Sequence, residues 1–122
     1  MSFTTDKIRL SPSHKCLVSE NGKPFLYLAD TWWYGATSRT SWDSFKKLVD
    51  LRSKQGFNAV QIVVGYPPEI DPHSVDASNS GGWPIINNKI NEAYFVDVDK
   101  RINYLLSHKI VPVIFGSWGY HS

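Results

Sequence analysis

The sequence predicts an α/β fold in which an N-terminal β-hairpin is followed by a β-α-β-α-β series that forms a parallel sheet. A continuous apolar run at 24–29 and largely apolar runs at 57–64 and 110–115 are typical of strands buried on both faces. Two segments with apolar residues at helical spacing separate these runs. Strands that alternate with helices are joined by right-handed crossovers, and such crossovers produce a parallel sheet.

The elements follow in order. Segments 8–10 and 16–18 predict short edge strands, and Asn21-Gly22 is a strong hairpin turn signal because both residues tolerate positive φ. Thr40 or Ser41 can cap a helix that begins near Trp42, and Gly56 is placed to end it. Its apolar stripe comprises Trp42, Phe45, Leu48 and Val49, with Arg52 in the same series.

The remaining chain predicts a long loop, a second helix and a third strand. Residues 65–91 are rich in Pro, Gly and Ser, so we expect one long loop. Pro112 lacks an N–H donor, which places it at a sheet edge, a bulge or a strand start. The second helix is marked by Phe95, Val98, Ile102, Leu105, Leu106 and Lys109.

Composition excludes several classes of function. The 13 Lys and Arg against 11 Asp and Glu are too balanced for a nucleic-acid partner. No apolar run is long enough to cross a membrane, and no signal-peptide pattern is visible, so a cytoplasmic location is expected. The single Cys16 rules out an internal disulfide and reads as a small buried hydrophobe. Phosphate-binding glycine loops and metal-ligand spacings are missing, so no cofactor or metal is expected.

Polar and aromatic residues gather where the predicted strands end, the edge at which parallel sheets bind ligands. An indole can pack on the apolar face of a sugar ring, and polar side chains can bind its hydroxyls. For each Trp, packing in the core is an equal alternative, and Gln61 could equally be a satisfied buried amide. The candidate substrate-binding residues are Asp30, Thr31, Trp32, Trp33, Gln61, Tyr66, Ser117 and Trp118, with Trp83 as a possible lid.

Four segments resemble the apiosidase-like glycoside hydrolases. They are 21–33 (NGKPFLYLADTWW), 51–61 (LRSKQGFNAVQ), 91–99 (NEAYFVDVD) and 117–119 (SWG). The resemblance implies that 1–122 is a single partial domain, the first three β/α units of a (β/α)8 TIM-barrel-like fold, with the barrel incomplete. It also implies hydrolysis of plant or microbial glycans, with the catalytic acids at the ends of later strands. The catalytic residues of this chain are therefore unknown, and Asp30 is expected to accept a hydrogen bond from a sugar hydroxyl.

Three hypotheses remain open. The first is a glycoside hydrolase segment with a carbohydrate substrate. Its open sheet edge would make it marginal alone, unless it self-associates or belongs to a longer polypeptide. The second is a short non-catalytic carbohydrate-binding protein derived from the same barrel. The third is an unrelated open βαβαβ domain of the flavodoxin-like kind, which the missing phosphate loop disfavours.

Overall fold

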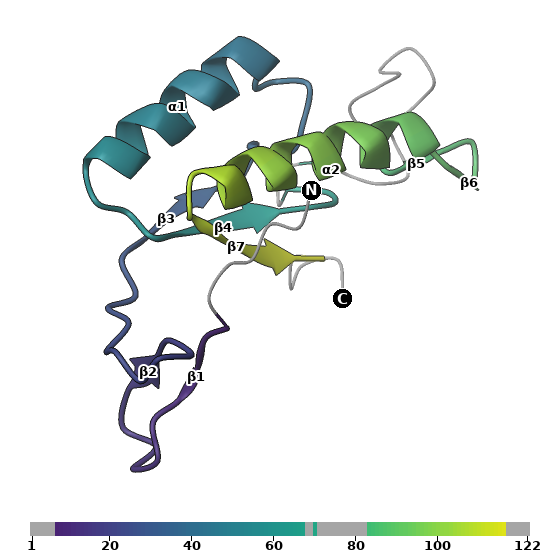
Figure 1. Ribbon diagram of the computed structural model, residues 1–122. Helices are drawn as coiled ribbons and strands as arrows, with labels where there is room; N and C mark the ends of the chain where they lie inside the picture. Colours follow the sequence, from purple (N-terminus) through teal and green to yellow (C-terminus); the bar gives the residue numbers. More distant parts are fainter. Residues whose placement is uncertain (1–6, 68–69, 71–82, 117–122) are drawn as a thin grey trace.

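The chain folds into an α/β structure in which the two long helices lie on one side of a small parallel sheet (Figure 1). The computed structural model describes residues 7–67, 70 and 83–116. The elements in chain order are β1 (Arg9–Leu10), β2 (Leu17–Val18), β3 (Ala29–Trp32), α1 (Trp42–Lys54), β4 (Ala59–Val63), β5 (Ile85–Ile86), β6 (Lys89–Ile90), α2 (Glu92–Ser107) and β7 (Val111–Phe115).

The central sheet has the order β3-β4-β7, and both neighbouring pairs are parallel. Ala29, Ala59 and Val111 lie at the same level of the three strands. Each strand is next to the one that follows it through a helix, as in the β/α units of a barrel. The sheet does not close: among the described residues, β3 and β7 each have one unpaired edge. The predicted class, an incomplete barrel-like sheet after an N-terminal hairpin, is confirmed.

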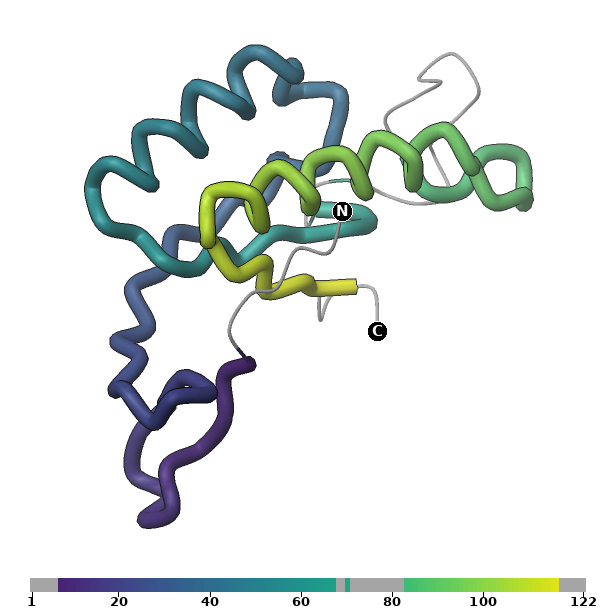
Figure 2. The backbone as a smooth tube through the Cα atoms, viewed as in Figure 1, coloured from purple at the N-terminus to yellow at the C-terminus, as the bar shows by residue number. Residues whose placement is uncertain are grey.

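The hydrophobic core lies between the helices and the sheet. Figure 2 shows α1 and α2 running over the same side of the strands, with the β1–β2 hairpin away from them. Phe45 is fully buried and stacks on Trp42, and its ring also meets the edge of Trp32. The buried cluster contains Trp32, Ala36, Phe45, Val49, Val60, Ile62, Tyr94, Val98, Leu105 and Ile110.

Helix α1 forms as its local signals predict. Ser41 is the N-cap, and its Oγ accepts a hydrogen bond from the Ser44 N–H at 3.2 Å. Gly56 follows the helix at φ +84°, a conformation that glycine adopts without strain. Phe45 and Val49 are buried on the face that the apolar spacing indicates. Pro112 lies in β7, an edge strand, as its missing donor requires.

The expected strand at 24–29 is wrong. The strand spans Ala29–Trp32, and the preceding residues are largely exposed, with Leu26 at 79%. The strand begins at Ala29 because its partner begins at Ala59, and the parallel ladder starts with this pair. Before Ala29 the segment makes isolated contacts, such as the hydrogen bond from the Phe25 N–H to the Leu17 carbonyl, and does not form a continuous ladder.

The expected unbroken loop at 65–91 is also wrong. The antiparallel pair β5–β6 lies within it, joined by Asn87 and Asn88 at φ +51° and +59°. Positive φ at both central residues is the mark of a tight hairpin turn, and asparagine tolerates it. Two Asn between Ile85-Ile86 and Lys89-Ile90 were the signal that this interpretation missed.

Helix α2 begins at Glu92, earlier than its apolar stripe suggests, and it buries Val98 and Leu105 of that stripe as predicted. Two other positions differ from the prediction. Phe95 is 39% exposed, whereas Arg101 is buried. The guanidinium is tolerated inside because Nε donates to Asp97 at 2.6 Å and an NH1 hydrogen bonds the Gly35 carbonyl at 2.9 Å. Cys16, expected to be buried, is exposed. In the described part of the chain, neither helix has the length and apolar character needed to span a bilayer.

Candidate functional site

The strands present two faces with different partners. Trp32 packs against Phe45 of α1, and Val60 and Ile62 belong to the same buried cluster, so these side chains face the helices. Because successive side chains of a strand alternate, the intervening residues point to the other side of the sheet. We call this side the inner face, since it corresponds to the inside of a closed barrel. It consists of Ala29, Thr31, Ala59, Gln61, Val63, Val111, Val113 and Phe115.

A hydrogen-bonded polar group occupies the middle of the inner face. Thr31 and Gln61 are register partners on adjacent strands, and Thr31 Oγ1 donates to Gln61 Oε1 at 2.9 Å. Gln61 Nε2 donates to the hydroxyl of Tyr27 at 3.0 Å. Among the described residues, the Gln61 amide uses one N–H and one lone pair and keeps one of each for another partner. Two of the predicted site residues, Thr31 and Gln61, are thus brought into direct contact.

Asp30 lies on the helix side of β3, not on the inner face. Its Oδ2 accepts from Trp32 Nε1 at 2.9 Å and from Arg52 Nε at 2.6 Å. Its Oδ1 accepts from the Thr31 N–H at 2.9 Å. Partial burial raises the pKa of Asp30, but the hydrogen bonds from Trp32, Arg52 and Thr31 outweigh it and hold the pKa below its ordinary value. The carboxylate thus joins β3 to α1, and its predicted contact with a sugar hydroxyl stays a prediction.

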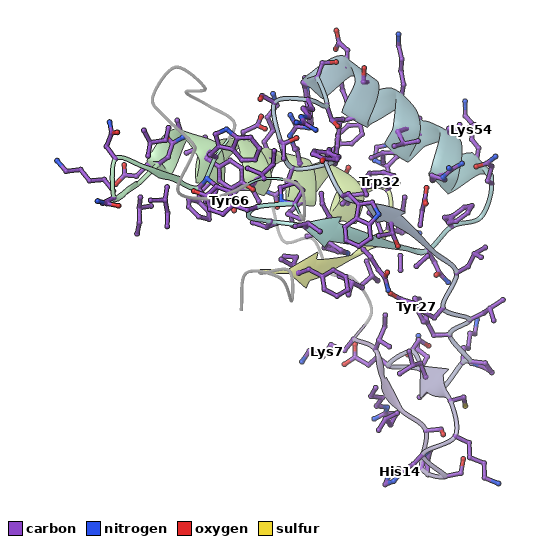
Figure 3. All side chains as sticks on the ribbon, turned by 180° about the vertical axis from the view of Figure 1, so that it is seen from behind. Lys7, His14, Tyr27, Trp32, Lys54 and Tyr66 are labelled. Carbon is purple, nitrogen blue, oxygen red and sulfur yellow. The ribbon has the colours of Figure 1, made fainter. Side chains whose placement is uncertain are left out.

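Trp32 and Trp33 point in different directions. Trp32 is 7% exposed and lies between β3 and α1 (Figure 3). In this chain Trp32 therefore packs in the core, which was the alternative to contact with a ligand. Trp33 follows at the carboxyl end of β3 and is 38% exposed. Its exposure makes it the indole of this pair that a ligand can reach.

Tyr66 lies beyond the carboxyl end of β4, at the opposite end of the sheet from Tyr27 (Figure 3). Its ring stacks on Trp83 at 5.7 Å, and its hydroxyl donates to the Ile85 carbonyl at 3.1 Å. Partial burial raises the pKa of Tyr66. Trp83 is itself buried, so it supports Tyr66 and the β5–β6 hairpin. Ser117 and Trp118 lie outside the described residues, and their predicted roles stay predictions.

The carboxyl ends of β4 and β7 come close together at two glycines. A Cβ on Gly65 would lie 3.0 Å from the carbonyl oxygen of Gly116, and Gly65 has φ +147°. Its N–H donates to the buried hydroxyl of Tyr94 at 3.0 Å. Burial raises the pKa of Tyr94 to about 12, so this hydroxyl stays neutral at physiological pH. A side chain at position 65 would force the two strand ends apart.

Carboxylates are distributed away from the inner face in the described part of the chain. Apart from Asp30, they lie in the hairpin (Glu20), on α1 (Asp43, Asp50) or on α2 (Glu92, Asp97, Asp99). Glycoside hydrolysis ordinarily needs two carboxyl groups on either side of the scissile bond. Glu69, in the long segment after β4, is not among the described residues. No group of three or more His, Cys, Asp or Glu suited to a metal ion occurs within 7–67, 70 and 83–116.

Sequence reasoning missed Tyr27 and Asn58. Tyr27 reads as one apolar residue within a run, and its hydroxyl reaches Gln61 from a position 34 residues earlier. Asn58 precedes β4, and its side chain binds the backbone of Leu26 and Leu28. The only local signal was a polar residue at the start of an apolar strand.

Comparisons with known proteins show the family of this chain and, separately, its fold. A family model described as the apiosidase-like catalytic domain matches residues 11–122. A solved glycoside hydrolase matches with a TM-score of 0.66 and 21% identity, over 94% of this chain and 26% of its own. A glycoside hydrolase family 5 protein from Bacteroides vulgatus matches with a TM-score of 0.69 and 21% identity, over 94% and 25%. The chain thus spans about a quarter of the length of these solved structures. No curated protein matches it.

Proposed function

Because this chain belongs to the apiosidase-like catalytic domain family, we propose that it forms part of the carbohydrate-binding cleft of a glycoside hydrolase barrel. On this proposal residues 1–122 are one partial domain that supplies the first three β/α units. The likeness to glycoside hydrolase folds over 94% of the chain supports this assignment.

The observation that carries the proposal is the polar pair on the inner face. Thr31 and Gln61 hold each other at 2.9 Å, and Gln61 keeps an N–H donor and a lone pair for a further partner. The part-exposed ring of Trp33 follows β3, and that of Phe115 belongs to the last residue of β7, so both lie on the carboxyl side of this pair. Binding sites combine apolar rings with a few placed polar groups, and in parallel barrels they lie at the carboxyl ends of the strands. A sugar offers both hydroxyls and an apolar face to such a surface.

Hydrolysis needs more than the inner face provides. The described carboxylates lie elsewhere, so the acid pair must come from other parts of the protein. We propose that a longer polypeptide supplies it and hydrolyses glycosidic bonds in plant or microbial polysaccharide side chains. Two observations support this: the matched structures are about four times as long, and β3 and β7 have unpaired edges that a barrel would fill.

The test is a titration of the 122-residue chain with neutral sugars and pectic oligosaccharides, followed by NMR and tryptophan fluorescence. We expect shifts at Thr31 and Gln61 with a dissociation constant of about 1 mM, since only part of the cleft is present. Gln61→Leu should abolish these shifts. Gln55→Leu is the matched control, because Gln55 lies at the end of α1 and should leave binding unchanged. A folded chain whose inner-face signals respond to no saccharide would refute the proposal.

A second candidate is a non-catalytic carbohydrate-binding protein derived from the same barrel. It is favoured by one observation, the absence of a carboxylate pair from the inner face in the described residues. Affinity separates the two candidates. A monomeric chain that binds a saccharide with a micromolar dissociation constant, about 1,000-fold tighter than we expect for a partial cleft, would favour the binding protein. Reducing-sugar release that appears only when later strands are supplied would favour the hydrolase.

A further inference from the structure

The segment before β3 is held by the side chain of Asn58, the residue immediately before β4. Asn58 Oδ1 accepts a hydrogen bond from the Leu28 N–H at 3.0 Å, and its Nδ2 donates to the Leu26 carbonyl. The N–H groups of Asn58 and Ala59 both donate to the Leu28 carbonyl, at 3.1 and 3.3 Å. The amide of Asn58 therefore binds the backbone on both sides of Tyr27, where the β3–β4 ladder has not yet begun.

These hydrogen bonds matter because the segment buries little apolar surface. The side chains of Leu26 and Leu28 are exposed, so packing contributes little to fixing the backbone there. An exposed segment without ladder bonds or packing samples many conformations. The side chain of Asn58 supplies a constraint that ladder hydrogen bonds and apolar packing do not provide, and the position of Tyr27 depends on this constraint.

Tyr27 in turn fixes the amide of Gln61. Its hydroxyl binds Gln61 Nε2 at 3.0 Å, while Thr31 Oγ1 binds Gln61 Oε1 at 2.9 Å. With both ends of the amide held, its plane is set, and the remaining N–H and lone pair have defined directions. Tyr27 approaches from the amino end of β3, whereas sugars bind parallel barrels at the carboxyl ends of their strands. Tyr27 thus supports Gln61 from the side opposite the cleft.

We propose that Asn58 and Tyr27 are positioning residues for Gln61: Asn58 holds the backbone at Tyr27, and the Tyr27 hydroxyl holds the amide ready for a neutral sugar hydroxyl. The sugar rests on the proposed function, whereas the positioning is a property of the free protein. An amide that is already oriented loses less freedom when a ligand binds, so its release should weaken binding about three- to tenfold.

The first variant is Tyr27→Phe, which removes only the hydroxyl from a ring that is 43% exposed. In the free wild-type protein, ¹⁵N relaxation of the Gln61 side-chain amide should show that it is ordered. In Tyr27→Phe the amide should become mobile, and the dissociation constant for the sugar should rise about three- to tenfold. Tyr104→Phe is the matched control, since that hydroxyl binds Asp50 between the helices and should affect neither measurement.

The second variant is Asn58→Asp, which keeps an acceptor for the Leu28 N–H but loses the donor to the Leu26 carbonyl. If the side-chain amide of Gln61 becomes mobile in Asn58→Asp, this would support the inference that Asn58 positions Gln61 through Tyr27, because Gln61 itself is unchanged. An ordered Gln61 amide in Tyr27→Phe would overturn the inference, whether or not the protein binds sugar. A mobile amide with unchanged affinity would overturn it as well. If the wild type binds no sugar, the proposed function fails, and the order of the amide still decides whether Asn58 and Tyr27 position it.

Discussion

Replacement of Asp30 separates a structural role from a role in sugar binding. The carboxylate accepts hydrogen bonds from Trp32 Nε1, Arg52 Nε and the Thr31 N–H, so Asp30→Ala leaves three donors without their acceptor. Each such bond contributes about 0.5–1.5 kcal/mol, which gives a total of roughly 2–4 kcal/mol. The side chain is 26% exposed, and water can replace part of what is lost. We therefore expect Asp30→Ala to lower the free energy of unfolding by about 2 kcal/mol, the lower end of this range.

The assay is thermal and urea unfolding of wild type, Asp30→Ala, Asp30→Asn and Arg52→Ala, with the double variant to complete a cycle. A loss of about 2 kcal/mol should lower Tm by roughly 6–10 °C in a chain of this size. Asp30→Asn keeps a hydrogen-bond acceptor and should therefore lower Tm by less than Asp30→Ala does. Because the two residues are in contact, the double variant should lose less stability than the sum of the single variants.

The pH dependence has a defined sign. The folded-state pKa of Asp30 lies below its ordinary value of 3.8, so its stabilising effect is present above that value. It is lost as the pH falls through the lower folded-state pKa. The stability advantage of wild type over Asp30→Asn should therefore be full at neutral pH and shrink below about pH 4. An Asp30→Ala variant with unchanged Tm but abolished sugar binding would refute this reasoning and make Asp30 a ligand contact.

Three further changes test the packing around the site. Phe45→Ala leaves a cavity at a fully buried position and should lower the free energy of unfolding in urea by about 3–5 kcal/mol. Phe95→Ala, at a 39% exposed position, should lower it by less than about 1 kcal/mol. Equal losses would contradict the assignment of Phe45 to the core. Tyr94→Phe leaves the Gly65 N–H without its acceptor and should cost about 1–3 kcal/mol. In wild type the pKa of Tyr94 is raised to about 12. The contribution of its neutral hydroxyl to stability should therefore be full below pH 10.0 and lost towards pH 12. A spectrophotometric titration in which every tyrosine ionises near pH 10.0 would contradict this. Gly35→Ala places a Cβ 3.0 Å from a neighbouring β3 side chain and should cost about 1–3 kcal/mol, so a thermal midpoint equal to wild type would show that the contact relaxes freely.

Local signals were sufficient for much of the fold. The α1 helix follows from a Ser41 cap, an apolar stripe and Gly56, all within a few residues of one another. The order of strands and helices follows from alternating patterns along the chain. Thr31 and Gln61 were predicted as site residues because polar groups near strand ends are uncommon within apolar runs, and the structure places them in contact.

Errors arose where a distant partner decides the outcome. Arg101 lies on the same helical face as Val98 and Leu105, but its burial depends on the carbonyl of Gly35, 66 positions earlier, and the sequence does not indicate that partner. The strand expected at 24–29 begins instead at Ala29, where the ladder with β4 starts. Asp30 was expected at the end of a strand, but it lies inside β3, and its carboxylate accepts a hydrogen bond from Arg52 of α1.

The sequence by itself determined the two long helices, the second and third strands of the parallel sheet, and the family to which the chain is similar. These properties depend on neighbouring residues and on motifs that can be read along the chain. Only the tertiary structure decided which face each strand residue occupies, because a shift of one residue in register reverses every side chain. That choice turns Asp30 towards Arg52 and places Gln61 between Thr31 and Tyr27 on the inner face.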